Sequence, residues 1–254
     1  MQKSFIIFLV YLPLALSSAQ SFGDVCGAKP VPYQAEYAVS RKGKAAGSML
    51  VILENTGPDV FIYSMDTRIK WGLVRPKILQ RSEFRWQNGS FLPVRFQSTQ
   101  KLSFYKRSEW VNFNWETGKA TGRKKRVDFE VDIHPGVQDK LTVYLLLARE
   151  LCSERSTIDA EIISGPNRSH HSYQLQGKES MDTTLGVLET IHIRRGRADG
   201  ERQTDLWHAG EIGFLPVKLV YRDKKDVTTM RLKSITFSKH SVRSDRITRK
   251  QSNG

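Results

Sequence analysis

The feature that most constrains this chain is a regular succession of short runs rich in Val, Ile, Thr, Tyr and Phe, each ended by a turn signal. The run at 33–41 alternates apolar and polar residues and meets a Lys-Gly-Lys turn, and the run at 78–87 meets Asn-Gly, a two-residue hairpin signal. Such spacing predicts a mainly β protein, built as a single curved antiparallel sheet or open β-barrel. Further strands are predicted at 46–54, 59–69, 92–101, 104–115, 119–122, 126–133, 157–164, 170–181, 187–195, 202–208, 214–222 and 227–237.

One segment departs from the strand pattern. Residues 139–152 contain no Gly or Pro and are rich in Leu and Ala, which predicts a helix at about 139–151. Asp139 suits the N-cap position. Apolar residues occupy nearly every side, so we expect the helix to be buried against or inside the curve of the sheet and packed on it.

The N-terminus has the pattern of a secretory signal peptide. A short basic start precedes an apolar run, and Ser17 and Ala19 supply small residues for cleavage after Ala19. The apolar run is too short for a good membrane span, although an uncleaved anchor is the alternative. We therefore expect export to the periplasm. The expected parts are a signal peptide at 1–19, an N-terminal segment at 20–31, a single β-rich domain at 32–238 and a basic, disordered tail at 239–254.

The chain contains two cysteines, Cys26 and Cys152. In an oxidising compartment an even pair predicts one disulfide, which would tie the mature N-terminus to the end of the helix. Two thiols in a reduced or buried state are the alternative.

The formal net charge of the chain is +14, with basic runs at 41–44, 122–126, 194–197 and 223–225. Such an excess favours anionic partners. In an exported protein these are anionic lipid, lipopolysaccharide, acidic glycan or an envelope protein, and not nucleic acid. The alternative is that the runs are solvated turns that keep the protein soluble.

The tetrapeptide Phe-Leu-Pro-Val occurs twice, at 91–94 and 214–217. Alternation predicts that Leu92, Val94 and Phe96 share one face of a strand, with Pro93 and Arg95 on the other. The second copy predicts the same for Leu215, Val217 and Leu219, opposite Pro216 and Lys218. Proline belongs at a strand start or on an edge. Trp86 and Trp207 lie on the preceding strands, so each copy is interpreted mainly as a folding device at a corner of one sheet.

The chain contains no nucleophile elbow, metalloprotease, Cys-x-x-Cys or phosphate-loop motif. His170 and His171 are adjacent, so on a strand they point to opposite faces, and the other histidines have no ligand spacing. Asp205, near several arginines, is interpreted as a salt-bridge residue. We therefore predict no catalytic residues, no metal and no cofactor, and a hydrolase with an unrecognised site is the less favoured alternative.

Several segments together resemble the bacterial exported family called domain of unknown function 3108. They are YQAEYAVSRKGKAAG, NGSFLPVRF, FNWETGKATG, GVQDKLTVYLLLARELC, GKESMDTTLGVLETIHIRR and LWHAGEIGFLPVKL, which span about residues 32 to 236. The resemblance implies an envelope protein with a strongly curved antiparallel sheet. More loosely, the hairpins are similar to those of the lipoprotein-carrier class, in which a half-open barrel wraps an apolar cavity.

The leading hypothesis is a non-enzymatic envelope protein that binds a hydrophobic or amphipathic ligand, such as a lipid, in a half-open barrel. A structural or interaction protein that docks on an envelope complex or acidic glycan is the alternative. Four basic residues, Arg123, Lys124, Lys125 and Arg126, are expected to contact a headgroup. The expected cavity face consists of Leu92, Val94, Phe96, Leu215, Val217, Leu219, Trp86 and Trp207.

Overall fold

The computed structural model describes residues 27–70, 72–102, 105–153, 155–196 and 201–238. The predicted signal peptide, Cys26 and the C-terminal tail lie outside these residues. The described part consists of strands, one α-helix, α1 (Thr142–Leu151), and one short 3₁₀ helix, η1 (Gly210–Ile212). The strands are β1 (Tyr33–Arg41), β2 (Lys44–Asn55), β3 (Val60–Ile69), β4 (Lys77–Gln87), β5 (Ser90–Leu102), β6 (Tyr105–Asn114), β7 (Lys119–Lys124), β8 (Val127–Asp132), β9 (Thr157–Ile163), β10 (Arg168–Thr183), β11 (Gly186–Gly196), β12 (Arg202–Ala209), β13 (Leu215–Asp223) and β14 (Asp226–Phe237).

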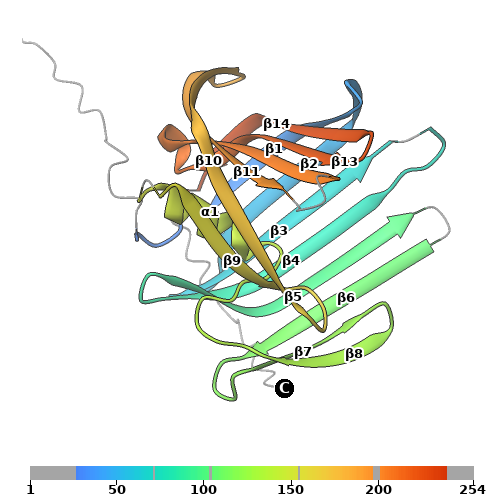
Figure 1. Ribbon diagram of the computed structural model, residues 1–254, viewed down its shortest axis with the longest axis vertical. Coiled ribbons are helices and arrows are strands. Elements are labelled where there is room, and N and C mark those ends of the chain that lie inside the picture. Colours follow the sequence, from blue (N-terminus) through green and yellow to red (C-terminus); the bar gives the residue numbers. More distant parts are fainter. Residues whose placement is uncertain (1–26, 71, 103–104, 154, 197–200, 239–254) are drawn as a thin grey trace, which may run out of the picture.

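All 14 strands belong to one antiparallel sheet. Its order is β8-β7-β6-β5-β4-β3-β2-β1-β14-β13-β12-β11-β10-β9. Strands that follow each other in the chain pair from β1 to β8 and from β9 to β14, and β1 pairs with β14. The edge strands β8 and β9 do not pair with each other in the described residues. The sheet therefore curves strongly without closing into a barrel, and α1 lies within its curve (Figure 1).

The predicted fold class is confirmed, because every run that the sequence marks as a strand lies on a strand. The hairpin signals also fall between strands. Asn88 and Gly89 form the β4–β5 turn with φ angles of 50° and 74°, conformations that Asn and Gly adopt at low cost. Strands joined by a hairpin pair with each other, so local sequence determines most of the strand pairs. The β1–β14 pair is the exception, because it joins strands that are far apart in the chain.

Helix α1 begins at Thr142, three residues after the predicted start, because residues 140–141 form a turn. Asp139 nevertheless acts as a cap. Its Oδ1 accepts hydrogen bonds from the backbone N–H groups of Leu141 at 2.7 Å and Thr142 at 2.9 Å. The Ser82 hydroxyl, on β4, donates to the other carboxylate oxygen. The buried Asp139 side chain therefore satisfies the first helical amides and attaches the helix to the sheet.

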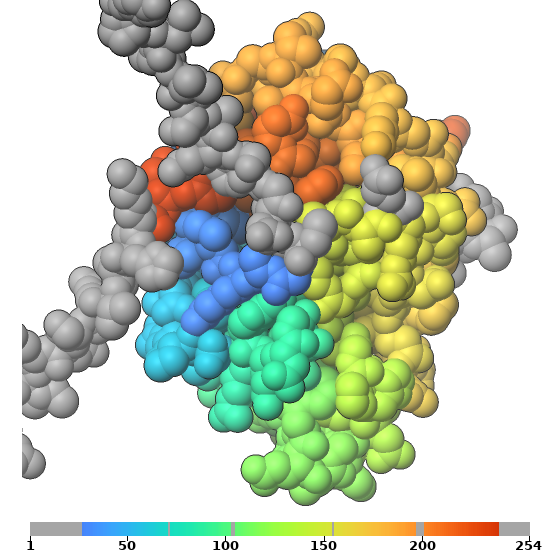
Figure 2. Space-filling model, turned by 90° about the vertical axis from the view of Figure 1, so that its left-hand side faces the viewer, coloured from blue at the N-terminus to red at the C-terminus, as the bar shows by residue number. Residues whose placement is uncertain are grey.

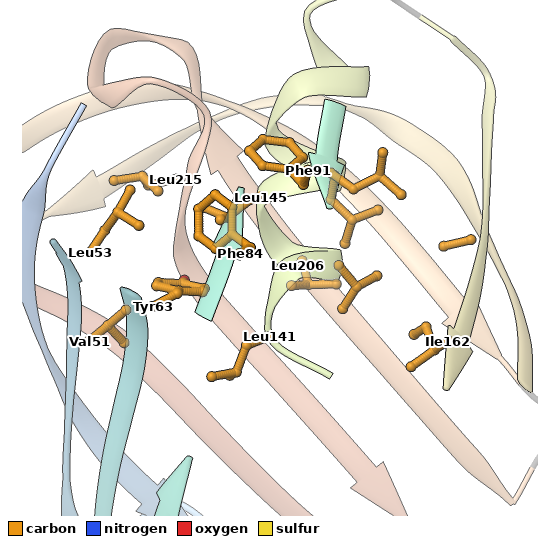
Figure 3. Close-up of a cluster of buried hydrophobic side chains, with 14 of the residues drawn as sticks. Val51, Leu53, Tyr63, Phe84, Phe91, Leu141, Leu145, Ile162, Leu206 and Leu215 are labelled. Carbon is orange, nitrogen blue, oxygen red and sulfur yellow. The ribbon is translucent and has the colours of Figure 1, made fainter. Parts of the chain in front are cut away.

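The helix and the concave face of the sheet form one hydrophobic core. Seven of the ten residues of α1 are buried, as the sequence predicts for a helix that is apolar on most sides. Leu145 and Leu141 lie among side chains from β2, β4 and β12, including Leu53, Phe84 and Leu206 (Figure 3). The interior of the curve is thus occupied by the protein's own side chains.

The first Phe-Leu-Pro-Val copy contains a β-bulge that changes which residues face the core. Phe84 pairs with Pro93 and Glu83 with Arg95, which leaves Val94 as an extra residue. Pro93 and Phe96 are consequently buried, whereas Leu92 and Val94 are only half-buried. The prediction that Leu92, Val94 and Phe96 share one face is therefore wrong, because one inserted residue reverses the alternation.

The second copy has a bulge at the equivalent residue. Trp207 pairs with Lys218 and His208 with Pro216, so Val217 is the extra residue. Leu215 and Val217 are buried in the core, and Leu219 packs against it. Leu215 pairs with Ala209 and Leu219 with Leu206, so Leu215 and Leu219 lie on opposite faces of the sheet. The prediction that Leu215, Val217 and Leu219 share one face is therefore also wrong.

In both copies the proline precedes the ladder to the next strand, which begins at Arg95 in β5 and at Lys218 in β13. The predicted position at a strand start is confirmed for Pro216, the second residue of β13. Pro93 is the fourth residue of β5 and lies where that strand has no partner on the β6 side.

The packing of α1 predicts a large cost for shortening its central side chain. Leu147 is fully buried, so Leu147→Ala should lower the free energy of unfolding by about 3 kcal/mol through lost burial and a cavity. Chemical denaturation followed by circular dichroism measures this. Leu73→Ala is the matched control at a fully exposed leucine and should change stability by less than about 0.5 kcal/mol. Equal effects of the two substitutions would contradict the described core.

Candidate functional site

The pairing of the strands places seven of the twelve hairpin turns at one end of the sheet. Successive strands run in opposite directions, so the turns that end β1, β3, β5, β7, β9, β11 and β13 all lie on the same side. We name this side the basic end. In Figure 1 the ends of β3, β5 and β7 follow one another along the right-hand side. The opposite end, with the remaining hairpin turns, faces the viewer in Figure 2.

Charge is distributed very unequally between the two ends. An end comprises its hairpin turns and the three strand residues on either side of each turn. The described residues of the basic end then carry twenty-one Lys and Arg side chains and five carboxylates. The five hairpin turns of the opposite end carry two basic residues and five carboxylates. The excess positive charge of the described residues is therefore concentrated on one side.

Several of these cations have no ion pair within the described residues. Arg41 binds Asp226, and Arg68 and Lys77 bind Asp66, so part of the charge is neutralised locally. Six exposed residues on the turns after β3, β5 and β7 have no such carboxylate partner. They are Lys70, Arg75, Lys101, Lys106, Lys125 and Arg126. These side chains are available to an anionic partner.

The four predicted headgroup residues lie on the β7–β8 hairpin but differ in their contacts. Arg123 forms a two-pronged ion pair with Asp128, with an Nη2–Oδ2 distance of 2.7 Å. Lys124 donates to the backbone carbonyl of Ser164, a contact that spans the gap between the two edges of the sheet. Burial lowers the pKa of Lys124, and the nearby Lys140 lowers it further. Only Lys125 and Arg126, at the tip, are exposed cations with no carboxylate partner among the described residues.

The eight predicted cavity residues do not form one face. Phe96, Leu215 and Val217 are buried in the core, and Trp86 packs on Phe91 with 4.9 Å between ring centroids. Neither of two open hollows on the described surface contains any of the eight. One of about 500 Å³ lies over β6 to β8, beside Trp110 and Phe129. The other, of about 270 Å³, lies beside Leu151, Cys152 and Phe214. The predicted ligand-binding role of the eight therefore stays a prediction.

Asp205 is the centre of a buried ionic cluster. Its carboxylate accepts hydrogen bonds from Arg194 Nε at 2.7 Å, His192 Nε2 at 2.9 Å and Gln203 Nε2 at 2.7 Å, and also from Arg222. Burial alone would raise the pKa of Asp205, but these donors outweigh it and lower the pKa from 3.8 to about 2. The predicted salt-bridge role of Asp205 is confirmed.

Trp207 lies beside this cluster on the same face of the sheet, because Asp205 and Trp207 are two residues apart on β12. Its indole is stacked on His192, with 4.2 Å between ring centroids, and Lys218 Nζ lies 3.9 Å from its ring centre on β13. The indole N–H donates to Glu179. These contacts enclose Trp207 and pack β10 to β13 against one another.

The Asp205 cluster predicts a defined pH dependence of stability. Asp205→Asn should lower the free energy of unfolding at pH 7 by about 2 kcal/mol, since several donors lose a charged acceptor. The folded-state pKa lies below the ordinary value, so the contribution of Asp205 is present above pH 3.8 and is lost as the pH falls towards about 2. Urea denaturation of both proteins across this range measures the difference.

The control for this experiment is Asp128→Asn, which removes an exposed carboxylate that also binds an arginine. It should change stability by less than about 0.5 kcal/mol. A difference between Asp205→Asn and the unsubstituted protein that stays constant down to pH 2 would contradict the ionic role.

The described residues contain no group of three or more His, Cys, Asp or Glu side chains that could hold a metal ion. Their α-helix is also not long and apolar enough to cross a membrane. His208 is fully buried, its Nδ1–H donates a hydrogen bond to the Phe214 carbonyl at 2.7 Å, and burial lowers its pKa to about 4. Cys152 directly follows α1, and because Cys26 lies outside the described residues, the predicted disulfide stays a prediction.

The family model described as "Protein of unknown function (DUF3108)" matches residues 33–233. The chain belongs to this family. The match covers most of the sheet and all of α1, and it confirms the resemblance that the sequence motifs indicate. No curated protein matches the chain.

Among solved structures, the family member described here is similar to the crystal structure of a beta-barrel-like protein of domain of unknown function DUF1849 from Brucella abortus. The TM-score is 0.58 at 10% sequence identity, and the similarity covers 84% of this chain and 100% of the other. At this identity the similarity shows the fold alone. The similarity to the lipoprotein-carrier class stays a prediction.

The sequence identifies some basic runs, but it does not show that they lie together at one end of the sheet. Lys101 and Lys106, for example, lie outside any basic run and become part of the site only because the β5–β6 turn lies next to the β3–β4 and β7–β8 turns. Counting the hairpins along the chain could have identified these lysines, because every second turn of an antiparallel meander lies at the same end.

Proposed function

We propose that this protein is exported to the periplasm and acts there as a non-enzymatic binding protein, which docks on an anionic component of the cell envelope through its basic end. The observation that carries the proposal is the separation of charge between the two ends of the sheet. The signal-peptide pattern at residues 1–19 supports the location.

The separation of charge argues against a purely solubilising role of the cations. Basic residues that only keep a protein in solution serve equally well on any turn. Here they gather on the turns of one end, while the turns of the other end carry mainly carboxylates. A one-sided positive field orients the protein towards an anionic surface and accelerates association with it.

A hydrophobic ligand inside the curve of the sheet has less support. That hypothesis needs an apolar space facing the Phe-Leu-Pro-Val strands. Phe96, Leu215 and Val217 pack in the core instead, together with the buried side of α1. The docking role, proposed from the sequence as the alternative, therefore becomes the favoured function.

Charge reversal at the basic end tests the docking role. Lys106→Glu combined with Lys125→Glu should lower binding of the purified protein to envelope membranes at least about tenfold, since each cation near an anionic surface contributes about 1 kcal/mol. Cosedimentation at increasing salt concentration measures this, and the difference should shrink as salt screens the charges.

The matched control is Arg81→Glu combined with Arg85→Glu, two exposed arginines of β4 outside the turns of the basic end. It changes the net charge by the same amount and should leave binding nearly unchanged. Equal losses in both double variants would show that net charge alone controls binding, and the proposal would be wrong.

Export is tested independently by cell fractionation. The protein should be found in the periplasmic fraction with a mass that corresponds to cleavage after Ala19, since small residues stand at the positions that signal peptidase recognises. A cytoplasmic protein that retains residues 1–19 would contradict the proposed location.

A further inference from the structure

Exposed apolar side chains gather on the same turns as the unpaired cations. Large hydrophobic residues with high exposure occur at eight positions of the described chain. Five of these, Leu73, Leu79, Leu102, Tyr105 and Val127, lie on or next to the β3–β4, β5–β6 and β7–β8 turns. The three turns are neighbours, because β3 to β8 are consecutive in the sheet (Figure 1). We name these five residues, with the described residues that surround them on the three hairpins, the apolar tips.

The exposure of the apolar tips is unusual for hairpin turns, which favour Gly, Pro, Asn, Asp and Ser. The Leu73 side chain is fully exposed at 101%, and Val127 is 64% exposed at the end of the β7–β8 hairpin. Neither belongs to the hydrophobic core. Their exposure is therefore unfavourable in water and calls for a partner that covers apolar surface.

Cations flank each apolar tip. Lys70 and Arg75 lie on either side of Leu73, and Lys125 and Arg126 directly precede Val127. Near Tyr105, the Arg107 guanidinium lies 5.7 Å from the ring centre and donates to the hydroxyl at 3.4 Å. Apolar and amphipathic side chains bordered by Lys and Arg are the combination that binds the interface of an anionic bilayer.

We propose that the apolar tips insert into the headgroup region of an anionic lipid bilayer, while the neighbouring cations bind lipid phosphates. This inference rests on the proposed docking function and names its partner as a lipid surface. A bilayer fits better than an acidic protein or a soluble glycan, because charge alone would bind those partners and leave Leu73 and Val127 uncovered. Three neighbouring turns on one side can also meet a plane together.

The opposite end provides an internal comparison. Leu185 and Val187 are also exposed, at the β10–β11 turn, but their neighbouring charges along the chain are Asp182 and Glu189. One cation, Lys233 on β14, lies beside this turn, because Thr184 donates a hydrogen bond to its backbone carbonyl at 2.7 Å. Carboxylates therefore outnumber cations at this turn, whereas cations predominate at the apolar tips. An anionic bilayer repels carboxylates, so the β10–β11 turn should stay in water.

The first test measures cosedimentation of the complete mature protein, without residues 1–19, with unilamellar vesicles of phosphatidylglycerol and phosphatidylethanolamine. Leu73→Ser combined with Val127→Ser should lower the apparent affinity at least about tenfold without changing the net charge. The matched control, Leu185→Ser with Val187→Ser, should bind like the unsubstituted protein. Both pairs are exposed, and unchanged thermal unfolding confirms that each variant is folded.

The second test reports insertion directly. Leu73→Trp should lose fluorescence on vesicles whose phosphatidylglycerol carries brominated acyl chains, beyond the loss seen in the unsubstituted protein. Leu185→Trp should show no additional loss. Equal quenching at the two positions would overturn the insertion of the apolar tips.

The failure of this inference differs from the failure of the proposed function. If the Lys106→Glu and Lys125→Glu protein loses binding to envelope membranes while Leu73→Ser with Val127→Ser does not, the apolar insertion is wrong and the docking function stands. If the purified protein binds neither the envelope membranes nor the anionic vesicles, both are wrong. Equal binding to vesicles of phosphatidylcholine alone would also overturn the requirement for an anionic surface.

Discussion

The buried carboxylate of Asp139 connects the helix to the sheet and fixes what the interior of the fold can contain. It accepts hydrogen bonds from Ser82 on β4 and from the amides of Leu141 and Thr142 at the start of α1. Because a buried carboxylate is costly without such partners, this arrangement holds the helix in one position. The helix then fills the concave side of a sheet that does not close on itself. A fold whose interior is occupied in this way presents its turns and outer face to partners.

The second constraint is the alternation of strand direction. In an uninterrupted antiparallel order, each turn lies at the end opposite to the turn before it. Residues far apart in the sequence, such as Lys42 and Lys225, are thereby brought to the same end. Basic residues that are scattered along the sequence therefore gather at one end of the sheet. The hairpin turns of the other end carry a small excess of carboxylates. The fold itself, and no single motif, creates the surface that we propose for docking.

Much of the fold could be predicted from the sequence, because the relevant signals are local. Strand propensity, the Asn88–Gly89 turn and the helical run before Cys152 each act over a few residues. The bulge at Val94 could not be predicted, since an extra residue is defined only against the partner strand and changes which side chains reach the core. The cluster around Asp205 was predicted only as a salt bridge. Apart from Gln203 on the same strand, its other members come from β11 and β13, and their contacts with Asp205 depend on the register of those strands. The apolar tips were missed because exposure is a property of the folded chain.

The central claim is that the protein meets an anionic lipid surface with the turns of its basic end. Hydrogen–deuterium exchange of the intact protein, with and without phosphatidylglycerol-containing vesicles, tests this most directly because it reports every turn in one experiment. The account predicts slower exchange in the β3–β4, β5–β6 and β7–β8 turns and unchanged exchange in the β10–β11 and β12–β13 turns. Protection at the β10–β11 and β12–β13 turns, or no protection at any turn under conditions where the protein is bound, would contradict it.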